Sequence, residues 1–314
     1  MPIIKFDVAP LSVLSLIVDG ESLSRRAYHA FTRKDFIKQT KQGYYNGCFW
    51  GFFSWLKKRY QHYQPEELIV CWGDRKENLK RLEFFPSYKK SRFVETIPVA
   101  LNEQVRDIQL ALNLLGIKQY YSPGYEGDDV IAANIPKFFL KSNQIANTIN
   151  KKIFIISQDK DLLQLVNKYI EVIQLTTGNT GKDLIFDESA TEKKFGIPAS
   201  LISDYLTLIG DSGDDVPNIP SVGPKTAIML LKKFGPISDW FDKIDDLDIT
   251  LTLKQTLLTH KKQMIINKKL VCLSLYSDIP LVPVPVVKDS ISIEDLFKTY
   301  ELVDVFPHEF LFFD

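Results

Sequence analysis

The sequence predicts an α/β fold in which a central, mostly parallel sheet is flanked by helices. Two observations predict it: short β-rich apolar runs that end at turn residues, and amphipathic helical patterns between those runs. Such apolar runs are typical of buried parallel strands. With 314 residues and a 45% hydrophobic content, the chain can form one large or two modest domains with sizeable cores, which excludes wholesale disorder.

Three of the apolar runs predict strands, and acidic residues follow each one. They are Val13–Val18 before Asp19, Leu68–Trp72 before Asp74, and Ile153–Ile156 before Asp159 and Asp161. In doubly wound sheets, ligands bind beyond the carboxyl ends of the strands. Aspartate is common in turns, so a single such residue would carry little weight. Three strands that end in this way favour a functional edge of the sheet.

Helical patterns lie between the predicted strands. The segments Gly43–Tyr63 and Pro98–Leu115 place apolar residues at i, i+3 and i+4. A third apolar helix follows Asp128 and Asp129, and Pro136 predicts a kink or an early stop in it.

From about Pro198 onward, short helical segments alternate with Gly/Pro loops, which indicates a smaller helical unit. We therefore predict an α/β domain over residues 1–190 and a helical domain over residues 191–314. The last part of the second domain is expected to form an acidic tail, because Asp289–Asp314 holds seven acidic residues and one lysine.

The charge of the whole chain is balanced, since Lys plus Arg and Asp plus Glu both number 39. Zero net charge argues weakly against a general polyanion binder, but it allows basic and acidic regions that cancel in the sum. One basic region is Arg75–Arg92, where seven Lys or Arg residues stand against two Glu.

Cysteine usage and hydropathy exclude several classes of protein. The three cysteines are far apart and form no C-x-x-C pair, which argues against a disulfide framework or a zinc site and fits a reduced, cytoplasmic setting. No apolar run reaches the ~18 residues of a membrane span, and the N-terminus lacks the pattern of a signal peptide.

Nine carboxylates lie at predicted strand ends, loops and helix starts. They are Asp19, Asp74, Glu126, Asp128, Asp129, Asp159, Asp161, Asp211 and Asp214. Carboxylates that are neighbours in the sequence, such as Asp128 with Asp129, are common in the first turn of a helix or in a solvated loop, so each such cluster alone needs no functional explanation. Gathered on one edge they would repel each other, so a cation would have to offset them. Because no Cys or His stands at ligand spacing, an all-carboxylate set favours two Mg²⁺ or Mn²⁺ ions, which suit phosphodiester hydrolysis.

Two segments are candidates for contact with nucleic acid. In Arg75–Arg92, the aromatic residues Phe84, Phe85 and Tyr88 interleave with the basic ones, a pattern that suits phosphate contact and base stacking. The alternative is a solvated loop with one or two core aromatics. In the loop Asn218–Ala227, backbone amides at the start of a helix form a candidate phosphate site, although an ordinary capped helix would look the same.

Taken in order, these pieces resemble the phage and bacterial 5′→3′ exonuclease/flap endonuclease family, which includes the 5′-nuclease domain of bacterial DNA polymerase I. The resembling stretches are Leu16–Gly20, Tyr88–Arg92, Gly124–Val130, Ser157–Leu165 and Gly210–Pro217, and Pro220–Ala227 looks like the family's helix–three-turn–helix. The resemblance spans about Val13 to Pro280. It implies a PIN-like 5′-nuclease fold with a helical arch at about 78–97 and a helix–three-turn–helix at about 205–235.

The resemblance also implies roles for individual residues. The first metal would be held by Asp19, Asp74, Glu126, Asp128 and Asp159, the second by Asp161, Asp211 and Asp214, with Asp129 at the edge of the shared cluster. Catalytic positions would be Lys89, Arg92, Asp159 and Asp161. DNA-contacting positions would be Arg26, Arg81, Tyr88, Lys89, Arg92, Lys225 and Thr226. Carbonyls of Ser221, Val222 and Gly223 would bind K⁺.

The sequence departs from the family pattern at a few positions. The family usually has Gly where this chain has Asn218 and Ser221, and Ser adopts a left-handed conformation less readily than Gly. Asp215 stands where Asn is usual. Because the sequence contains no polymerase domain, we expect a free-standing nuclease.

The function predicted from this resemblance is a structure-specific 5′ nuclease of DNA replication and repair. Its expected partners are DNA with a 5′ end, flap or branched junction, a replicative polymerase or a single-strand binding protein. We expect a monomer in the cytoplasm, with no membrane contact. One alternative is a non-catalytic DNA-junction-binding protein. A haloacid-dehalogenase-like phosphatase is a further alternative, but it needs Asp-x-Asp where this chain has Asp19-Gly20-Glu21.

Overall fold

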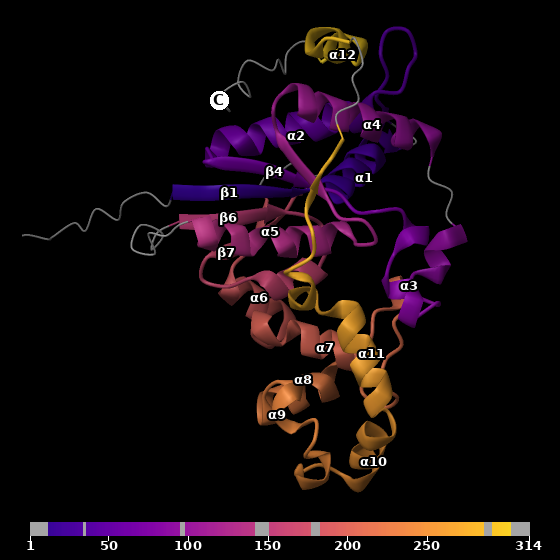
Figure 1. Ribbon diagram of the computed structural model, residues 1–314, viewed down its shortest axis with the longest axis vertical. Helices are drawn as coiled ribbons and strands as arrows, with labels where there is room; N and C mark the ends of the chain where they lie inside the picture. The colour runs from indigo at the N-terminus through magenta and orange to yellow at the C-terminus, as the bar shows by residue number, and fades with distance from the viewer. Residues whose placement is uncertain are drawn as a thin grey trace, which may run out of the picture.

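A seven-stranded sheet forms the centre of the upper layer of the molecule, and a group of short helices extends below it (Figure 1). The computed structural model describes residues 12–33, 36–94, 98–141, 151–176, 183–285 and 291–302. The strand order is β8-β7-β6-β1-β4-β5-β9. Their bounds are β1 Ser12–Asp19, β4 Glu67–Cys71, β5 Lys118–Tyr121, β6 Lys151–Ile156, β7 Ile170–Gln174, β8 Leu184–Phe186 and β9 Val282–Pro283.

The three predicted strands are confirmed as β1, β4 and β6, side by side and parallel at the centre of the sheet. β7 and β5 extend the parallel arrangement, whereas the edge strands β8 and β9 pair antiparallel. The chain passes from β1 to β4 on one side and reaches β6 on the other. β1 and β6 therefore flank the topological switch point, where doubly wound sheets bind their ligands.

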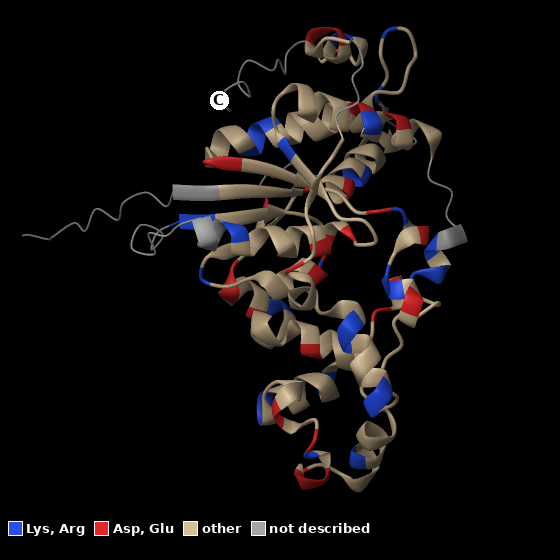
Figure 2. Ribbon diagram, viewed as in Figure 1, with Lys and Arg blue, Asp and Glu red and all other residues tan. Residues whose placement is uncertain are grey.

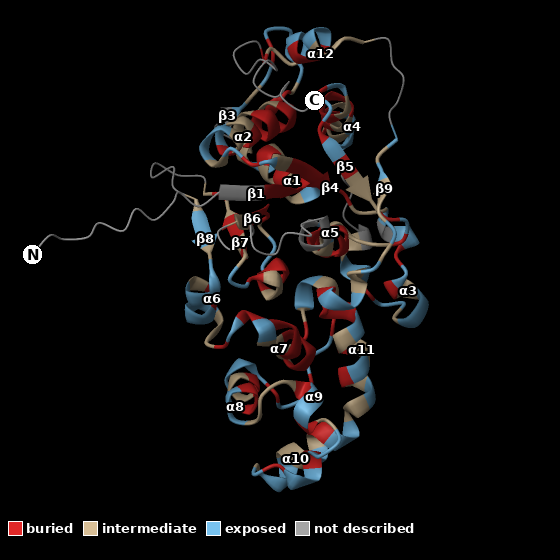
Figure 3. Cartoon of the chain, turned by 60° about the vertical axis from the view of Figure 1, so that its left-hand side comes forward, coloured by how far each residue is buried: buried red, intermediate tan, exposed pale blue. Residues whose placement is uncertain are grey.

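Helices cover both faces of the sheet. One face packs against α1 (Gly20–Phe31), α2 (Gly47–Tyr63) and α4 (Val99–Leu114), and the other against α5 (Gly127–Lys141). Alternation along β1 serves this arrangement, because Leu16 and Val18 join the first core while Ile17 joins the second. Figure 3 shows the buried residues concentrated on these strands and on the helix faces that meet them.

A helical unit with its own core follows β8. Its helices are α6 Glu188–Phe195, α7 Ile202–Ile209, α8 Pro224–Phe234, α9 Ile237–Trp240, α10 Leu251–Thr259 and α11 Lys261–Val271. Leu230, Trp240, Leu257 and Met264 are buried at its centre. α7 and α11 also pack on the second face of the sheet, which joins this unit to the α/β layer.

The segment between β4 and α4 stands beside the sheet. It contains α3 (Arg81–Phe84) between two 3₁₀ turns, Lys76–Asn78 and Lys90–Val94. Residues 95–97 of the expected arch lie outside the described part of the chain. A short ribbon, β2 (Thr32–Arg33) with β3 (Phe36–Ile37), connects α1 to α2.

The C-terminal part of the described chain returns to the α/β layer. β9 pairs with β5, and α12 (Ile293–Thr299) inserts the fully buried Phe297 between Phe49 and Phe53. This differs from the expected acidic tail of the second domain. The segment holds many acidic residues, but burial of Phe297 among aromatic side chains attaches it to the first core. Residues 289–290 and 303–314 of that expected tail lie outside the described residues.

Of the kink or early stop predicted at Pro136, the early stop is wrong. α5 runs through this residue to Lys141. Its first turns are secured by Val130, Ile131 and Ala133, which are buried against the sheet. This packing stabilises the helix enough to offset the hydrogen bond that proline cannot donate.

The packing of α12 gives a testable prediction. Phe297→Ala should lower the free energy of unfolding by about 3–5 kcal/mol, because it removes a fully buried aromatic side chain and leaves a cavity. Urea denaturation followed by circular dichroism measures this change. Val99→Ala, at a position that is 72% exposed, is the control and should shift stability by less than about 0.5 kcal/mol. Equal small effects of the two substitutions would contradict the packing.

Candidate active site

Acidic residues gather where the central parallel strands end, opposite the basic segment around α3 (Figure 2). Asp19 ends β1 and caps α1, since its Oδ1 accepts the amide of Ser22 at 2.9 Å. Its Oδ2 accepts the hydroxyl of Ser157, which follows β6, at 2.7 Å. This bond closes the switch point between β1 and β6. Burial raises the pKa of Asp19 to about 7.

Close backbone approach joins the end of β4 to the start of α5. A Cβ at Gly73 would lie 2.9 Å from the amide nitrogen of Gly127, so only glycine fits there. The neighbouring Asp74 accepts the amides of Gly124 and Arg75, both at 2.7 Å. Burial opposes ionisation of Asp74, but these amides lower its pKa overall. Asp74 is therefore ionised and fixed beside the first turn of α5.

A first carboxylate group forms at the start of α5. Glu126, Asp128 and Asp129 each offer an oxygen within 4.8 Å of the others. Burial, and then the charges of Asp129 and Glu126, raise the pKa of Asp128 well above its usual range. A cavity of about 310 Å³ opens above this group, and the carboxylates Asp19, Glu126, Asp128 and Asp159 all line it. The structure thus brings together acids from β1, α5 and the end of β6.

A second carboxylate group consists of Asp161, Asp211 and Asp214, and it adjoins Asp159. The Oδ1 of Asp159 accepts the amide of Asp161 at 2.8 Å, and Asp211 pairs with Lys160 at 3.1 Å. Burial, and then repulsion from Asp159 and Asp211, raise the pKa of Asp161 to about 8. Among the residues that the structure describes, none donates a hydrogen bond to the buried Oδ1 of Asp161.

The loop that carries Asp211 and Asp214 is held in a tight conformation. Gly210 has a φ of 69°, and a Cβ there would lie 2.3 Å from the carbonyl oxygen of Val216. This close turn directs Asp211 towards Lys160 and Asp214 towards the basic segment. Burial raises the pKa of Asp214 although Lys89 and Arg92 oppose the shift.

The basic segment closes over both carboxylate groups. Lys89 forms ion pairs with Glu126 and, at 3.4 Å, with Asp214. Arg92 lies 2.5 Å from an oxygen of Asp214 and donates to the carbonyl of Gly213 at 2.9 Å. The lysine and arginine therefore supply the positive charge that this arrangement of acids requires.

Hydrogen bonds fix the basic segment against the loop that carries Asp211 and Asp214. The amide and the hydroxyl of Ser91 both donate to Asp215 Oδ2 at 2.8 Å. Lys89 and Asp215 have left-handed backbones, with φ of 53° and 56°, and the amide of Lys89 donates to the carbonyl of Asp214. Asp215, one of the departures from the family pattern, thus contacts the segment that carries Lys89 and Arg92.

Two family models together match most of the chain. The N-terminal resolvase-like domain of the 5′-3′ exonucleases matches residues 14–196, and their C-terminal SAM fold matches residues 197–292. The chain belongs to the 5′-3′ exonuclease family. The resemblance inferred from the sequence motifs is thereby confirmed.

Relatives and solved structures agree with this assignment. A 5′-3′ exonuclease of Buchnera aphidicola subsp. Baizongia pistaciae is 34% identical over 81% of this chain and 80% of its own. One from Aquifex aeolicus is 37% identical over 71% and 70%. The T5 D15 protein co-crystallised with metal ions has a similar fold, with a TM-score of 0.64 and 18% identity over 93% of this chain and 98% of its own.

Several residues predicted to contact DNA are buried or hydrogen-bonded to other residues of the chain. Arg26 donates to Gln158 at 3.0 Å, and Arg81 is buried. Tyr88 is 3% exposed, and its hydroxyl lies 2.6 Å from Glu126. Stacking of Tyr88 on a base would require the segment to move, so its predicted role stays a prediction. Lys225 is exposed and Thr226 half-buried in the first turn of α8.

The predicted monovalent-ion loop has the strained residue that its sequence suggested. Ser221 has a φ of 61°, a conformation that glycine adopts more readily. Val222 is buried, and the carbonyl of Gly223 accepts the amide of Ala227 at 2.9 Å. The binding of K⁺ here stays a prediction.

Sequence reasoning missed three charged residues of the site. Glu21 and Arg25 line both cavities beside the carboxylates, one of about 310 Å³ and one of about 290 Å³. Their i, i+4 spacing on α1 was the available signal, since it places both on one helix face. Lys160 stands between Asp159 and Asp161 in the sequence, and only the fold shows that it pairs with Asp211.

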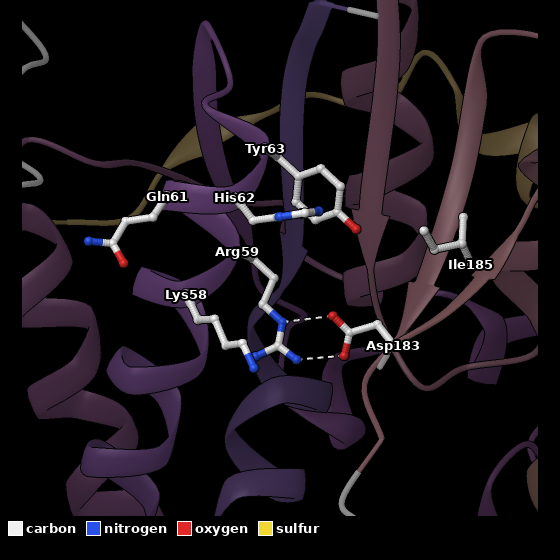
Figure 4. Close-up of a pocket in the computed structure, with 7 residues that line it drawn as sticks. All are labelled: Lys58, Arg59, Gln61, His62, Tyr63, Asp183 and Ile185. Carbon is white, nitrogen blue, oxygen red and sulfur yellow. Dashed lines mark hydrogen bonds and ion pairs between the residues drawn. The ribbon is translucent and has the colours of Figure 1, made fainter. Parts of the chain in front are cut away.

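Another cavity, of about 570 Å³, lies between the end of α2 and β8 (Figure 4). Its buried Arg59 donates from Nη2 and Nε to the two carboxylate oxygens of Asp183, at 2.5 and 2.9 Å. Arg59 and Asp183 therefore neutralise each other, and Lys58 and His62 also line this cavity. The carboxylate edge remains the better candidate for chemistry.

The raised pKa values predict a pH-dependent stability of the metal-free protein. Folded Asp161 and Asp19 hold protons to about pH 8 and about pH 7, whereas unfolded Asp releases them near pH 4. The folded state thus binds more protons between these values, so stability falls as pH rises from about 4 to about 8. Denaturant titrations in EDTA measure this slope.

Asp161→Asn should flatten that slope and stabilise the protein at pH 8 by about 1–3 kcal/mol. The exposed Asp245 provides a matched control, because Asp245→Asn should leave the slope as in the wild type. A wild-type protein that gains stability between pH 5 and pH 8 would refute the effect of burial.

Proposed function

We propose that this chain hydrolyses DNA phosphodiester bonds at 5′ ends and 5′ flaps, with two Mg²⁺ or Mn²⁺ ions held by the acidic edge of the sheet. Membership of the 5′-3′ exonuclease family gives the nuclease activity. The observation that carries the finer proposal is the joining of two carboxylate groups beneath Lys89 and Arg92. The substrate specificity and the ions are parts of the proposal.

The donor set fits hard divalent cations. All candidate ligands are carboxylates, which suit Mg²⁺ and Mn²⁺. The buried and unpartnered Oδ1 of Asp161 is the kind of atom that a cation satisfies. The ions would be held by Asp19, Asp74, Glu126, Asp128 and Asp159 in one group and Asp161, Asp211 and Asp214 in the other. When bound, they would supply an activated water and offset charge on the attacked phosphate.

The basic segment would act on the DNA phosphate. Lys89 and Arg92 now neutralise Glu126 and Asp214. Cations bound by these carboxylates would release the two side chains towards a phosphate in the cavity that Lys89 and Arg92 also line. There they would stabilise the charge that develops on the phosphate oxygens during attack. No nucleophilic side chain is required, because water is the nucleophile.

The helical unit would bind the duplex. Exposed Lys225 lies in the first turn of α8, where free backbone amides and the helix dipole favour phosphate. Support comes from the T5 D15 flap endonuclease, which was crystallised with DNA and metal ions and has a TM-score of 0.63 and 19% identity. K⁺ held by carbonyls at 221–223 is part of the proposal.

Other expectations about the cellular setting remain proposals. They are a cytoplasmic location, a monomeric state, and association with a replicative polymerase or a single-strand binding protein. None of the described helices is long and apolar enough to cross a membrane.

The alternative of a non-catalytic junction binder has little support. Asp19, Asp128 and Asp161 are kept buried although burial disfavours their ionised forms. A protein that only binds DNA would gain nothing from this cost, since these charges repel the phosphate backbone.

Cleavage of a labelled 5′-flap duplex tests the activity. Wild-type protein should release the flap with Mg²⁺ or Mn²⁺ and bind it intact in EDTA. Asp159→Ala should lower the single-turnover rate by at least about 100-fold while binding in EDTA persists, because it removes a carboxylate that would hold a metal ion and adds no barrier to the DNA backbone. Asp245→Ala is the exposed control and should cleave normally. An intact flap with wild-type protein and Mn²⁺ would overturn the proposal.

The role of Lys89 can be separated from binding. Lys89→Met keeps the aliphatic stem but removes the charge, and should lower the single-turnover rate about 100-fold. Lys89→Arg should restore part of that rate. The dissociation constant in EDTA should change much less than the rate. A loss confined to binding would show that Lys89 does not act on the phosphate during cleavage.

A further inference from the structure

Arg81 is buried and hydrogen-bonded within the protein, whereas a residue that contacts DNA has to be accessible. It is 3% exposed and makes four hydrogen bonds. Its Nε donates to the carbonyl of Leu270 at 3.0 Å. Nη1 donates to Glu126 Oε2 at 3.1 Å and to Asp129 Oδ2 at 2.5 Å, and Nη2 donates to Asp129 Oδ1 at 2.7 Å. All of these acceptors belong to the protein itself.

Aromatic rings cover the guanidinium group as well. It lies 4.4 Å from the ring centroid of Tyr276 and 5.7 Å from that of Tyr88. A phosphate would have to displace a bidentate carboxylate partner and these rings. That partner, Asp129, is fully buried, so the displacement would leave an unpaired charge in the interior.

The contacts of Arg81 join three elements that are distant in the sequence. Arg81 opens α3, Glu126 and Asp129 lie at the start of α5, and Leu270 lies in the last turn of α11. The last carbonyls of a helix lack an intrahelical donor, and a cation there is favoured by the helix dipole. Arg81 therefore caps α11 and ties it to the basic segment and to the first carboxylate group.

The two oxygens of Glu126 have different partners because of this arrangement. Oε2 is held by Arg81 and by the hydroxyl of Tyr88, whereas Oε1 faces Lys89. Exchange of Lys89 for a cation would leave the contacts to Oε2 in place. Both oxygens of Asp129 are engaged by Arg81, so Asp129 serves mainly as the partner of this arginine.

We propose that Arg81 is a positioning residue that fixes Glu126 for metal binding and anchors the basic segment to α11, and that it does not contact DNA. This inference rests on the proposed function, since it assumes that Glu126 holds a metal ion. It replaces the DNA-contacting role that the sequence suggested for Arg81.

The test uses Arg81→Met, which keeps an unbranched apolar side chain in place of the aliphatic stem but removes the guanidinium group and its charge. Mn²⁺ affinity, measured by electron paramagnetic resonance without DNA, should fall by about tenfold or more, as for other residues that orient metal ligands. The dissociation constant for a 5′-flap duplex in EDTA should stay within about twofold, with an unchanged salt dependence. Lys80→Met, at the exposed neighbouring position, is the control and should leave Mn²⁺ affinity unchanged.

Arg81→Lys and a double variant keep the inference falsifiable if Arg81→Met folds poorly. Arg81→Lys keeps a charge that would serve a phosphate, but it cannot pair with both oxygens of Asp129 and reach Leu270, so Mn²⁺ affinity should still fall. Arg81→Met/Asp129→Asn removes the unpaired buried charge. It should unfold at a higher temperature than Arg81→Met alone, because the two residues act as a pair.

The outcomes separate this inference from the proposed function. Weaker DNA binding by Arg81→Met in EDTA, a smaller salt dependence, rescue by Arg81→Lys and unchanged Mn²⁺ affinity would together overturn the positioning role and leave the nuclease proposal intact. Wild-type protein that binds no Mn²⁺ and leaves the flap intact would overturn the proposed function, and the positioning role with it.

Discussion

Repulsion among carboxylates confined to one edge of the sheet is the constraint on which the site depends. Asp19, Glu126, Asp128 and Asp159 line a single cavity, and Asp161 and Asp214 lie close to them. Like charges at this density are stable only if they are protonated or paired with cations. The structure uses both means: burial raises the pKa of Asp128 and Asp161, and Lys89 and Arg92 pair with Glu126 and Asp214.

The topology explains why the acids meet. β1 and β6 flank the switch point, so the residues that follow them must face each other, and the bond from Ser157 to Asp19 closes that contact. The close approach of Gly73 and Gly127 brings the start of α5 to the same place. Positive charge then has to come from outside the sheet. The segment around α3 supplies it, with Arg81 and Ser91 as its attachments.

Local patterns were enough to predict the strands and their acidic ends. Val13–Val18 and Ile153–Ile156 are short, β-rich and followed by turn residues, and the parallel sheet then determines which edge their acids occupy. The burial of Arg81 could not be predicted, because its partner Leu270 is 189 positions away in the chain. The pairing of β9 with β5 could not be predicted either, since a two-residue strand has no periodicity in the sequence.

Direct counting of bound ions tests the central claim that this edge exists to hold divalent cations. Mn²⁺ titration of the wild-type protein, followed by electron paramagnetic resonance near neutral pH, should reveal two ions per chain. Asp161→Asn should reduce this number to one, because Asp161 belongs to only one of the two carboxylate groups. Wild-type protein that binds no Mn²⁺ at millimolar concentration, or an Asp161→Asn variant that still binds two ions with wild-type affinity, would contradict the account.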